Sequence, residues 1–239
     1  MEIIQKKENS IIFKTKVDES LLNAIRRSVN QIPVMAIDEV EIHRNDSPLY
    51  DETIAHRIGL IPLKMEKSFK EGDEIKLKLR SKKGGIVYSG EIKGELSPVY
   101  DKIPITLLNE GKEIELVGLA RFGKSEDHSK FSPGIIFYRH SYEITIDKEF
   151  ESDIKTNFPD NKIKEKGDKI VIEDDKPRAI ADFCEGLALK KGKKIEIKEK
   201  DEKIVSIESF GQINPQEIFK KSIENLKKEL KEISKKLNK

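Results

Sequence analysis

A glycine-rich segment offers the most obvious candidate for chemistry. Gly118–Ser125 has glycine, four residues, glycine, lysine and serine, the spacing of a phosphate-binding loop. Ile170–Asp174 could supply the acidic strand that helps such a loop hold magnesium. The loop must open a helix whose amides bind phosphate, but residues 126–133 are polar, turn-rich and broken by a proline. A P-loop nucleotide hydrolase therefore remains only an alternative.

Other residue types that catalyse reactions or bind metals form no recognisable pattern. The four histidines lack the spacing of a metal site and lie in no nucleophile motif; they are His43, His56, His128 and His140. The single cysteine, Cys184, excludes an intramolecular disulfide and cannot alone hold zinc or an iron–sulfur cluster. Its place on the apolar side of a helix predicts a buried, inert thiol. We predict no catalytic residue, metal or cofactor.

Composition predicts a globular protein without a strong attraction to nucleic acid. The 239 residues allow one or two domains, and 46 basic residues balance 44 acidic ones to a net charge of +2. No export signal and no membrane-spanning apolar run is present. We therefore expect a cytoplasmic protein that does not enter membranes.

A two-faced helix near the start of the sequence organises the surrounding elements. The pattern predicts a helix over 20–32, capped by Asp18 or Ser20 and stopped by Pro33, followed by a strand over 34–43. Its apolar face comprises Leu21, Leu22, Ile25, Val29 and Ile32. Arg26 and Arg27 lie opposite, where they either face solvent or bind carboxylates or carbonyls of a partner.

A long helix over 215–238 ends the chain, with Asn214 as its N-cap and Pro215 at its first position. Its apolar residues follow a heptad pattern; they are Phe219, Ile223, Leu226, Leu230, Ile233 and Leu237. We call this row the seam. A helix of roughly 35 Å has more seam than one small sheet can cover, so we expect part of it to meet a second chain. An autonomous coiled-coil homodimer is one way to do so.

The remaining pattern indicates an α+β protein. Strands are expected at 2–6 and 10–17, a short helix capped by Asp51 over 52–57, and an antiparallel β region over 75–123. A helix over 177–189 and a hairpin over 195–210 follow.

Three stretches of the sequence match the signatures of a known family. The first comprises Asn23–Arg27, Ala36–Ile42 and Asp51–Leu63; the second is Ala120–Pro133; the third comprises Ile204–Gly211 and Asn214–Glu217. In these stretches the sequence resembles the D-subunit family of archaeal DNA-directed RNA polymerase, related to the amino-terminal domain of the bacterial alpha subunit and to the third-largest subunit of eukaryotic polymerase II. The second stretch contains the phosphate-loop pattern, which the resemblance thus explains as coincidence.

The resemblance implies a discontinuous architecture. A dimerisation domain, an antiparallel sheet with two long helices, would consist of residues 1–46 and 193–239. A mainly β domain, 47–192, would be inserted between these halves. Within it, 141–192 matches weakly and would be a ferredoxin-like sub-insert. Some members hold an iron–sulfur cluster there on several cysteines, and with Cys184 alone we expect none.

The resemblance also implies a non-catalytic role in assembling the transcription enzyme. Members pair with the small subunit L through the two helices and form a platform for subunits N and P and the second-largest subunit. DNA would be contacted only indirectly, through the complex. Residues expected between core and dimer interface are Leu21, Leu22, Ile25, Val29, Phe219, Ile223, Leu226, Leu230 and Ile233. Residues expected to contact the large subunits are Arg26, Arg27, Asp51, Glu52, His56 and Arg57.

Overall fold

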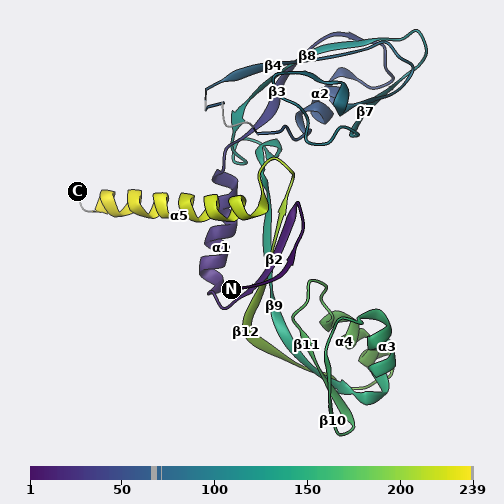
Figure 1. Ribbon diagram of the computed structural model, residues 1–239, viewed down its shortest axis with the longest axis vertical. Coiled ribbons are helices and arrows are strands. Elements are labelled where there is room, and N and C mark those ends of the chain that lie inside the picture. Colours follow the sequence, from purple (N-terminus) through teal and green to yellow (C-terminus); the bar gives the residue numbers. More distant parts are fainter. Residues whose placement is uncertain (66–68, 71, 238–239) are drawn as a thin grey trace. The chain divides into compact units, whose positions relative to one another are not determined.

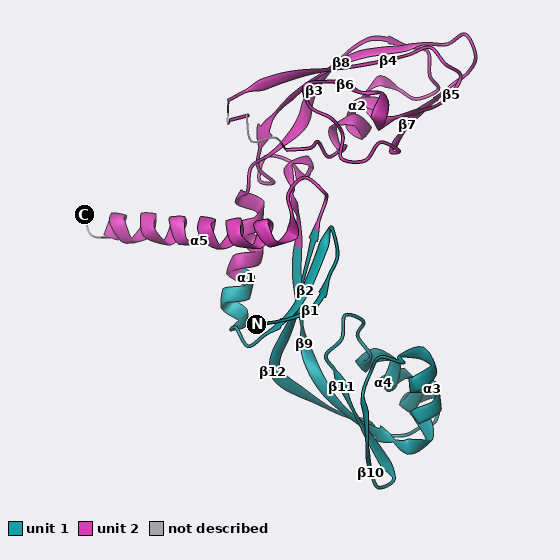
Figure 2. Ribbon diagram, viewed as in Figure 1, with its two compact units in different colours: residues 1–23, 136–208 teal, residues 24–135, 209–239 magenta. Residues whose placement is uncertain are grey.

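Antiparallel sheets dominate the fold, which a computed structural model describes for residues 1–65, 69–70 and 72–237 (Figure 1). The predicted mixture of helices and antiparallel strands is confirmed. The chain divides into two compact units, residues 1–23 with 136–208 and residues 24–135 with 209–239 (Figure 2). These units do not coincide with the expected domain bounds, which stay a prediction.

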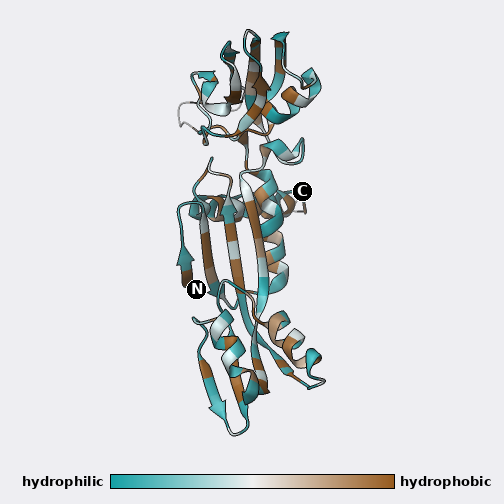
Figure 3. Cartoon of the chain, turned by 90° about the vertical axis from the view of Figure 1, so that its right-hand side faces the viewer, coloured by the Kyte–Doolittle hydropathy of each residue, from teal (hydrophilic) through white to brown (hydrophobic). Residues whose placement is uncertain are grey.

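The first unit is built on a six-stranded sheet. In spatial order its strands are β1 (Glu2–Lys6), β2 (Ser10–Thr15), β12 (Glu196–Ser209), β9 (Gly134–Asp147), β11 (Lys169–Asp174) and β10 (Ile163–Lys166). Hydrophobic residues alternate with hydrophilic ones along its strands (Figure 3), as expected for a sheet with one covered face. The predicted hairpin over 195–210 is wrong, because β12 is one continuous strand. Its charged centre, Glu199–Glu202, contains none of the glycine, proline or asparagine that tight turns favour.

Two helices cover the part of this sheet that β9, β11 and β10 form. The order β9, α3 (Glu151–Asn157), β10, β11, α4 (Ala181–Lys190), β12 is that of a split β-α-β unit, with a short helical turn η4 (Lys148–Phe150) before α3. Its core includes Ile144, Ile154, Ile172 and Cys184, all fully buried. The sequence pattern missed α3. The predicted helix over 177–189 begins later, at Ala181, and Pro177 lies outside it.

The second unit contains a four-stranded and a two-stranded sheet. The first orders β3 (Val34–Asn45), β8 (Ile114–Gly123), β4 (Glu74–Ser81) and β6 (Lys93–Gly94); the second pairs β5 (Gly85–Tyr88) with β7 (Pro104–Leu108). These strands confirm the predicted antiparallel region over 75–123. Short helical turns are η2 (Ser89–Glu91) and η3 (Ser129–Phe131).

A short helix, α2 (Asp51–Gly59), contributes to the core of the second unit. Ile54 and Ile58 on its inner face are both 0% exposed and belong to the same apolar cluster as Leu77 and Leu116. The sequence predicts Asp51 as the cap of this helix, but the N-cap is Tyr50 and Asp51 is the first helical residue.

The two predicted helices of the candidate interface are present. The first is α1 (Glu19–Ser28), which continues as a short turn η1 (Val29–Gln31), and the second is α5 (Pro215–Leu237). Asp18 caps α1, since its Oδ1 accepts a hydrogen bond from Ser20 N at 2.8 Å. Asn214 caps α5 through Oδ1, which accepts from Gln216 N at 3.0 Å. No helix in the described ranges is long and apolar enough to cross a membrane.

The two edges of the six-stranded sheet differ in chemistry. At one edge, β10 carries Lys164, Glu165 and Lys166, all exposed. At the other, the pairing of β1 with β2 is irregular between Ile3 and Gln5, which marks a bulge or a shift of register.

Candidate partner interface

The seam of α5 changes from covered to exposed along the helix. Phe219, Ile223 and Leu226 are half-buried within the chain. Leu230 is 57% exposed and Ile233 is 55% exposed. The last turns of α5 therefore present apolar side chains that this chain does not cover, which is typical of a surface that binds another protein.

The side of α5 that packs on its own chain is a neighbouring row. Pro215, Ile218 and Ser222 are the buried residues of the helix, and α5 contacts η1. Ser222 Oγ donates to Ile218 O at 2.8 Å, so this buried hydroxyl is satisfied within the helix. Sequence reasoning placed neither Ile218 nor Ser222 at a contact. The successive spacings of three and four from Pro215 to Ile218 and from Ile218 to Ser222 were the available signal, which the stronger heptad row obscured.

On α1 and the following turn η1, burial separates the expected interface residues into two groups. Leu22, Ile25 and Val29 are 3%, 6% and 2% exposed within the single chain, so they are core residues. Leu21 is 48% exposed. Of these four residues, Leu21 is the one that offers a large exposed surface to a partner.

A groove of about 480 Å³ lies where α1 and η1 approach α5. Leu226 lines it from α5, beside Glu229. Arg27 lines it from α1 and is exposed. The groove thus combines an apolar side chain with charges of both signs, a composition that suits the rim of a protein interface.

The residues expected to contact large subunits lie on two separate helices. Arg26 is half-buried and Arg27 exposed on α1, whereas the other candidates, Asp51, Glu52, His56 and Arg57, form the exposed face of α2. Two of them are anchored: Arg57 Nη1 donates to Ile105 O at 2.9 Å, and Asp51 Oδ1 accepts from Asn45 Nδ2 at 2.7 Å. The exposed face of α2 is therefore a charged surface on which hydrogen bonds hold the side chains of Asp51 and Arg57 in place.

A cluster around Asp38 connects β3, β8 and η3. Its carboxylate pairs with Arg121 and Lys130, and both cations also lie 5.2 Å from the centre of the Phe131 ring. Burial acts to raise the pKa of Asp38, but the hydrogen bonds and charges of Lys130 and Arg121 outweigh it and lower the pKa. Asp38 lies in the first stretch and its partners in the second, so this cluster joins two motifs that the sequence only showed separately.

An apolar hollow of about 380 Å³ was not foreseen. Leu60 and Pro62 line it together with Tyr100, Phe210 and Gln212. Tyr100 and Phe210 are each 42% exposed. Gln212 Nε2 donates to Met35 O at 2.9 Å, which fixes the segment after β12 beside β3.

The phosphate-loop pattern does not form a loop. Gly118–Gly123 lies within β8, which pairs with β3 on one side and β4 on the other. A Cβ on Gly118 would lie 2.9 Å from Ile37 Cγ2, and one on Gly123 would lie 2.6 Å from the Phe131 ring. These glycines serve close packing, and the paired backbone is not free to surround phosphate.

Comparison with known proteins gives one consistent result. The family described as the RNA polymerase Rpb3/Rpb11 dimerisation domain matches residues 12–230. The DNA-directed RNA polymerase subunit Rpo3 of Pyrococcus horikoshii is 33% identical over 237 residues, covering 92% of this chain and 90% of that protein.

Two further relatives of the same name match over a shorter span. Subunit Rpo3 of Pyrococcus furiosus is 39% identical over 160 residues, which cover 62% of this chain and 61% of the relative. That of Thermococcus kodakarensis is 37% identical over 160 residues, 62% of each chain. Each of these two matches spans less than two thirds of the relative's length.

Proposed function

This chain belongs to the RNA polymerase Rpb3/Rpb11 dimerisation-domain family, and we propose that it is a non-catalytic assembly subunit of DNA-directed RNA polymerase, the counterpart of the archaeal D subunit. The observation that carries the proposal is the exposed seam of α5, with Leu230 and Ile233 more than half exposed. The names of the relatives support it, since each is a subunit Rpo3 of such a polymerase.

The proposed first partner is the small subunit L. Helices α1 and α5 would pair with two helices of that subunit in a four-helix apolar interface. Leu21, Leu230 and Ile233 would then become buried, whereas Leu22, Ile25 and Val29 support the helix from inside the chain. Burying one such side chain contributes about 1.5–3 kcal/mol, so a few exposed seam residues suffice for a stable pair.

The proposed second surface faces the larger subunits. We assign Arg26, Arg27 and the exposed face of α2 to contacts with the second-largest subunit and with subunits N and P. Arginines and carboxylates of this kind form charge-assisted hydrogen bonds that fix orientation between subunits. DNA would be contacted only through the assembled enzyme. The proposal also includes a cytoplasmic location for the chain.

The proposed domain arrangement keeps the expected bounds, 1–46 with 193–239 for dimerisation and 47–192 as the inserted domain. The proposal includes no iron–sulfur cluster. A cluster needs several thiolate ligands, and this chain has one cysteine. Burial, with the nearby charge of Asp174, raises the pKa of the Cys184 thiol to about 12, so the donor atoms do not fit the group.

A binding experiment with subunit L of the same source tests the proposal. The chain carrying both Leu230→Asp and Ile233→Asp should bind at least ~100-fold more weakly, because two carboxylates would be buried in an apolar interface. Its circular dichroism should match that of the unaltered chain, since both positions are exposed. Lys235→Asp changes the net charge by the same two units but lies off the seam, and it should bind normally.

Two results would contradict the proposal. Equal affinity of the double variant and the unaltered chain would place the partner surface elsewhere. A stable symmetric dimer of the chain alone, which the double variant abolishes and subunit L does not dissociate, would favour the coiled-coil homodimer.

A further inference from the structure

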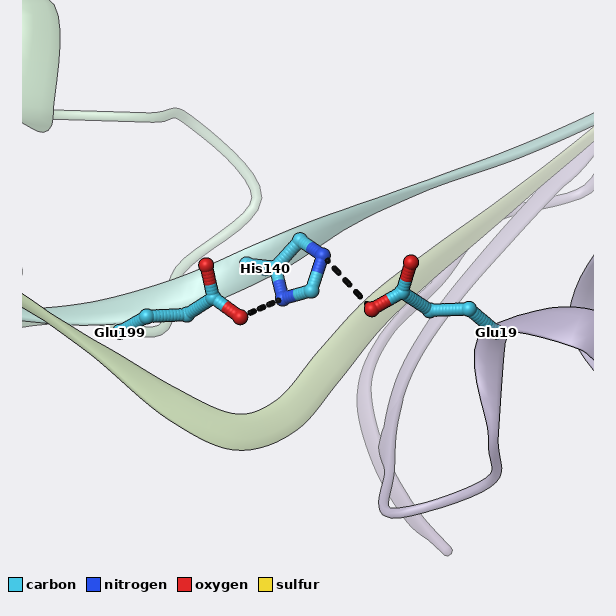
Figure 4. A group of neighbouring side chains, drawn as sticks. All are labelled: Glu19, His140 and Glu199. Atoms are coloured by element: carbon cyan, nitrogen blue, oxygen red, sulfur yellow. Dashed lines mark ion pairs between the residues drawn. The ribbon is translucent and has the colours of Figure 1, made fainter.

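Three side chains that are distant in sequence meet in the first unit. Glu19 begins α1, His140 lies on β9 and Glu199 on β12 (Figure 4). His140 Nε2 lies 3.2 Å from Glu19 Oε1, and His140 Nδ1 lies 2.9 Å from Glu199 Oε1. One ligand atom from each residue falls within 4.8 Å of the others. Sequence spacing had indicated no metal site at any histidine.

The two carboxylates require a cation at the ring of His140. A neutral imidazole carries one N–H, so its second nitrogen presents a lone pair. Here both nitrogens face a carboxylate oxygen, and one of these contacts would be repulsive without a proton or a metal ion. Nδ1 is buried and has no hydrogen bond of good geometry among the described residues. The ring is only 20% exposed, which reduces the ability of water to screen this repulsion.

The distance between Nε2 and Glu19 Oε1 suits a shared metal ion. An ion about 2.1 Å from each atom, a usual length for zinc ligands, would hold them at about 100°, between octahedral and tetrahedral angles. The other nitrogen lies 2.9 Å from Glu199 Oε1; once its N–H points at that oxygen, the carboxylate orients the metal-bound histidine. One imidazole and carboxylate oxygens favour Zn²⁺, Co²⁺ or Ni²⁺ over Mg²⁺ or Ca²⁺.

We propose that His140 and Glu19 bind a divalent transition metal ion of the Zn²⁺ class, with Glu199 orienting the imidazole. Water completes the coordination, because both carboxylate side chains are at least half exposed, at 50% and 59%. The ion connects the start of α1 to β9 and β12, so metal binding stabilises the first unit. This inference does not depend on the proposed function.

One cation already competes for the site. Lys203 Nζ lies 3.9 Å from Glu19 Oε1, and its side chain is 14% exposed. A lysine at this distance neutralises part of the charge that attracts the metal. The variant Lys203→Gln should therefore bind the ion more tightly than the unaltered chain, a result that a purely structural histidine would not produce.

Calorimetric titration of the full-length chain, without a polyhistidine tag, with zinc chloride at about pH 7.5 tests the proposal. We expect saturable binding of one ion per chain. His140→Gln should weaken binding at least ~tenfold, as should Glu19→Gln, and loss of the orienting carboxylate in Glu199→Gln should weaken it about tenfold. His43→Gln is the matched control: His43 Nδ1 lies 3.8 Å from a single carboxylate, that of Glu41, and this variant should bind zinc normally.

Thermal unfolding provides a second readout. Zinc should raise the unfolding temperature of the unaltered chain and of His43→Gln, but not that of His140→Gln. The proposal is overturned if one-to-one binding is absent, or if His140→Gln binds zinc as the unaltered chain does. It is also overturned if zinc leaves the unfolding temperature unchanged at saturation, since the three elements would then not be joined by the ion.

Discussion

The buried ion pair between Arg139 and Asp174 gives the sharpest test of the energetics of the first unit. Asp174 is fully buried at the end of β11, and Arg139 Nη2 lies 2.8 Å from its Oδ1. The same guanidinium donates to Lys176 O at 2.6 Å and to His140 O at 3.1 Å. Asp174 Oδ2 has no hydrogen bond within the described ranges, so the carboxylate depends on one cation.

Replacing Arg139 by methionine removes that cation and leaves the carboxylate buried. Breaking a buried pair on one side costs about 3–5 kcal/mol, which for a protein of this size lowers the unfolding temperature by about 10 °C. Replacing Asp174 by leucine as well should restore most of the loss, because a pair of apolar residues needs no compensation. Urea and thermal unfolding of both variants measure these changes.

An exposed pair provides the matched control for this experiment. Arg80 is 57% exposed and pairs with Glu113, so Arg80→Met should cost no more than about 1 kcal/mol. If Arg139→Met costs as little as Arg80→Met, the carboxylate of Asp174 is hydrated in solution and the burial argument is wrong. If the double variant is no better than the single one, the loss arises from packing instead of charge.

Three further changes test other parts of the structure. Gly123→Ala should lower the free energy of unfolding by about 1–3 kcal/mol, because the new Cβ would lie 2.6 Å from the Phe131 ring; urea unfolding measures it, and no loss would show that the ring moves freely. The pKa of Asp38 is lowered below its ordinary value of 3.8, so its contribution to stability is complete above that pH and is lost as the pH falls through the lowered pKa. Asp38→Asn should therefore be less stable than the unaltered chain at neutral pH, and the difference should narrow in acid; a constant difference would mean that pairing with Lys130 does not perturb the carboxylate. Burial raises the pKa of Cys184 to about 12, so iodoacetamide should modify this thiol only on unfolding, and rapid modification of the folded chain would contradict its burial.

The sequence predicted those elements whose signals are local. Asp18 and Asn214 mark the starts of α1 and α5 because a cap acts within two or three residues of its own position. By contrast, α3 was missed because Ile154 is the only buried residue within it, too few to set an amphipathic pattern. The hairpin predicted within β12 is wrong because the charged run Glu199–Glu202 interrupts the apolar alternation as a turn would, although it lies within one continuous strand.

The candidate sites were predictable only in part, and for a different reason. The seam of α5 is a periodic pattern, so the sequence displayed it, but which row of the helix faces its own chain depends on tertiary packing. Ile218 is buried and Leu230 exposed, although both are aliphatic residues of one helix. Glu19, His140 and Glu199 come from three elements: strand order brings β9 beside β12, and tertiary packing of the start of α1 adds Glu19.

The edges of the six-stranded sheet bear on how this protein avoids aggregation. An open strand edge is a template on which any other chain can add a strand, and such growth has no natural end. Exposed charges on β10 and the pairing irregularity at β1 oppose this addition at both sides. Addition of strands to this sheet is thereby disfavoured, whereas side chains on helices match one partner surface and then stop, as a complex of defined stoichiometry requires.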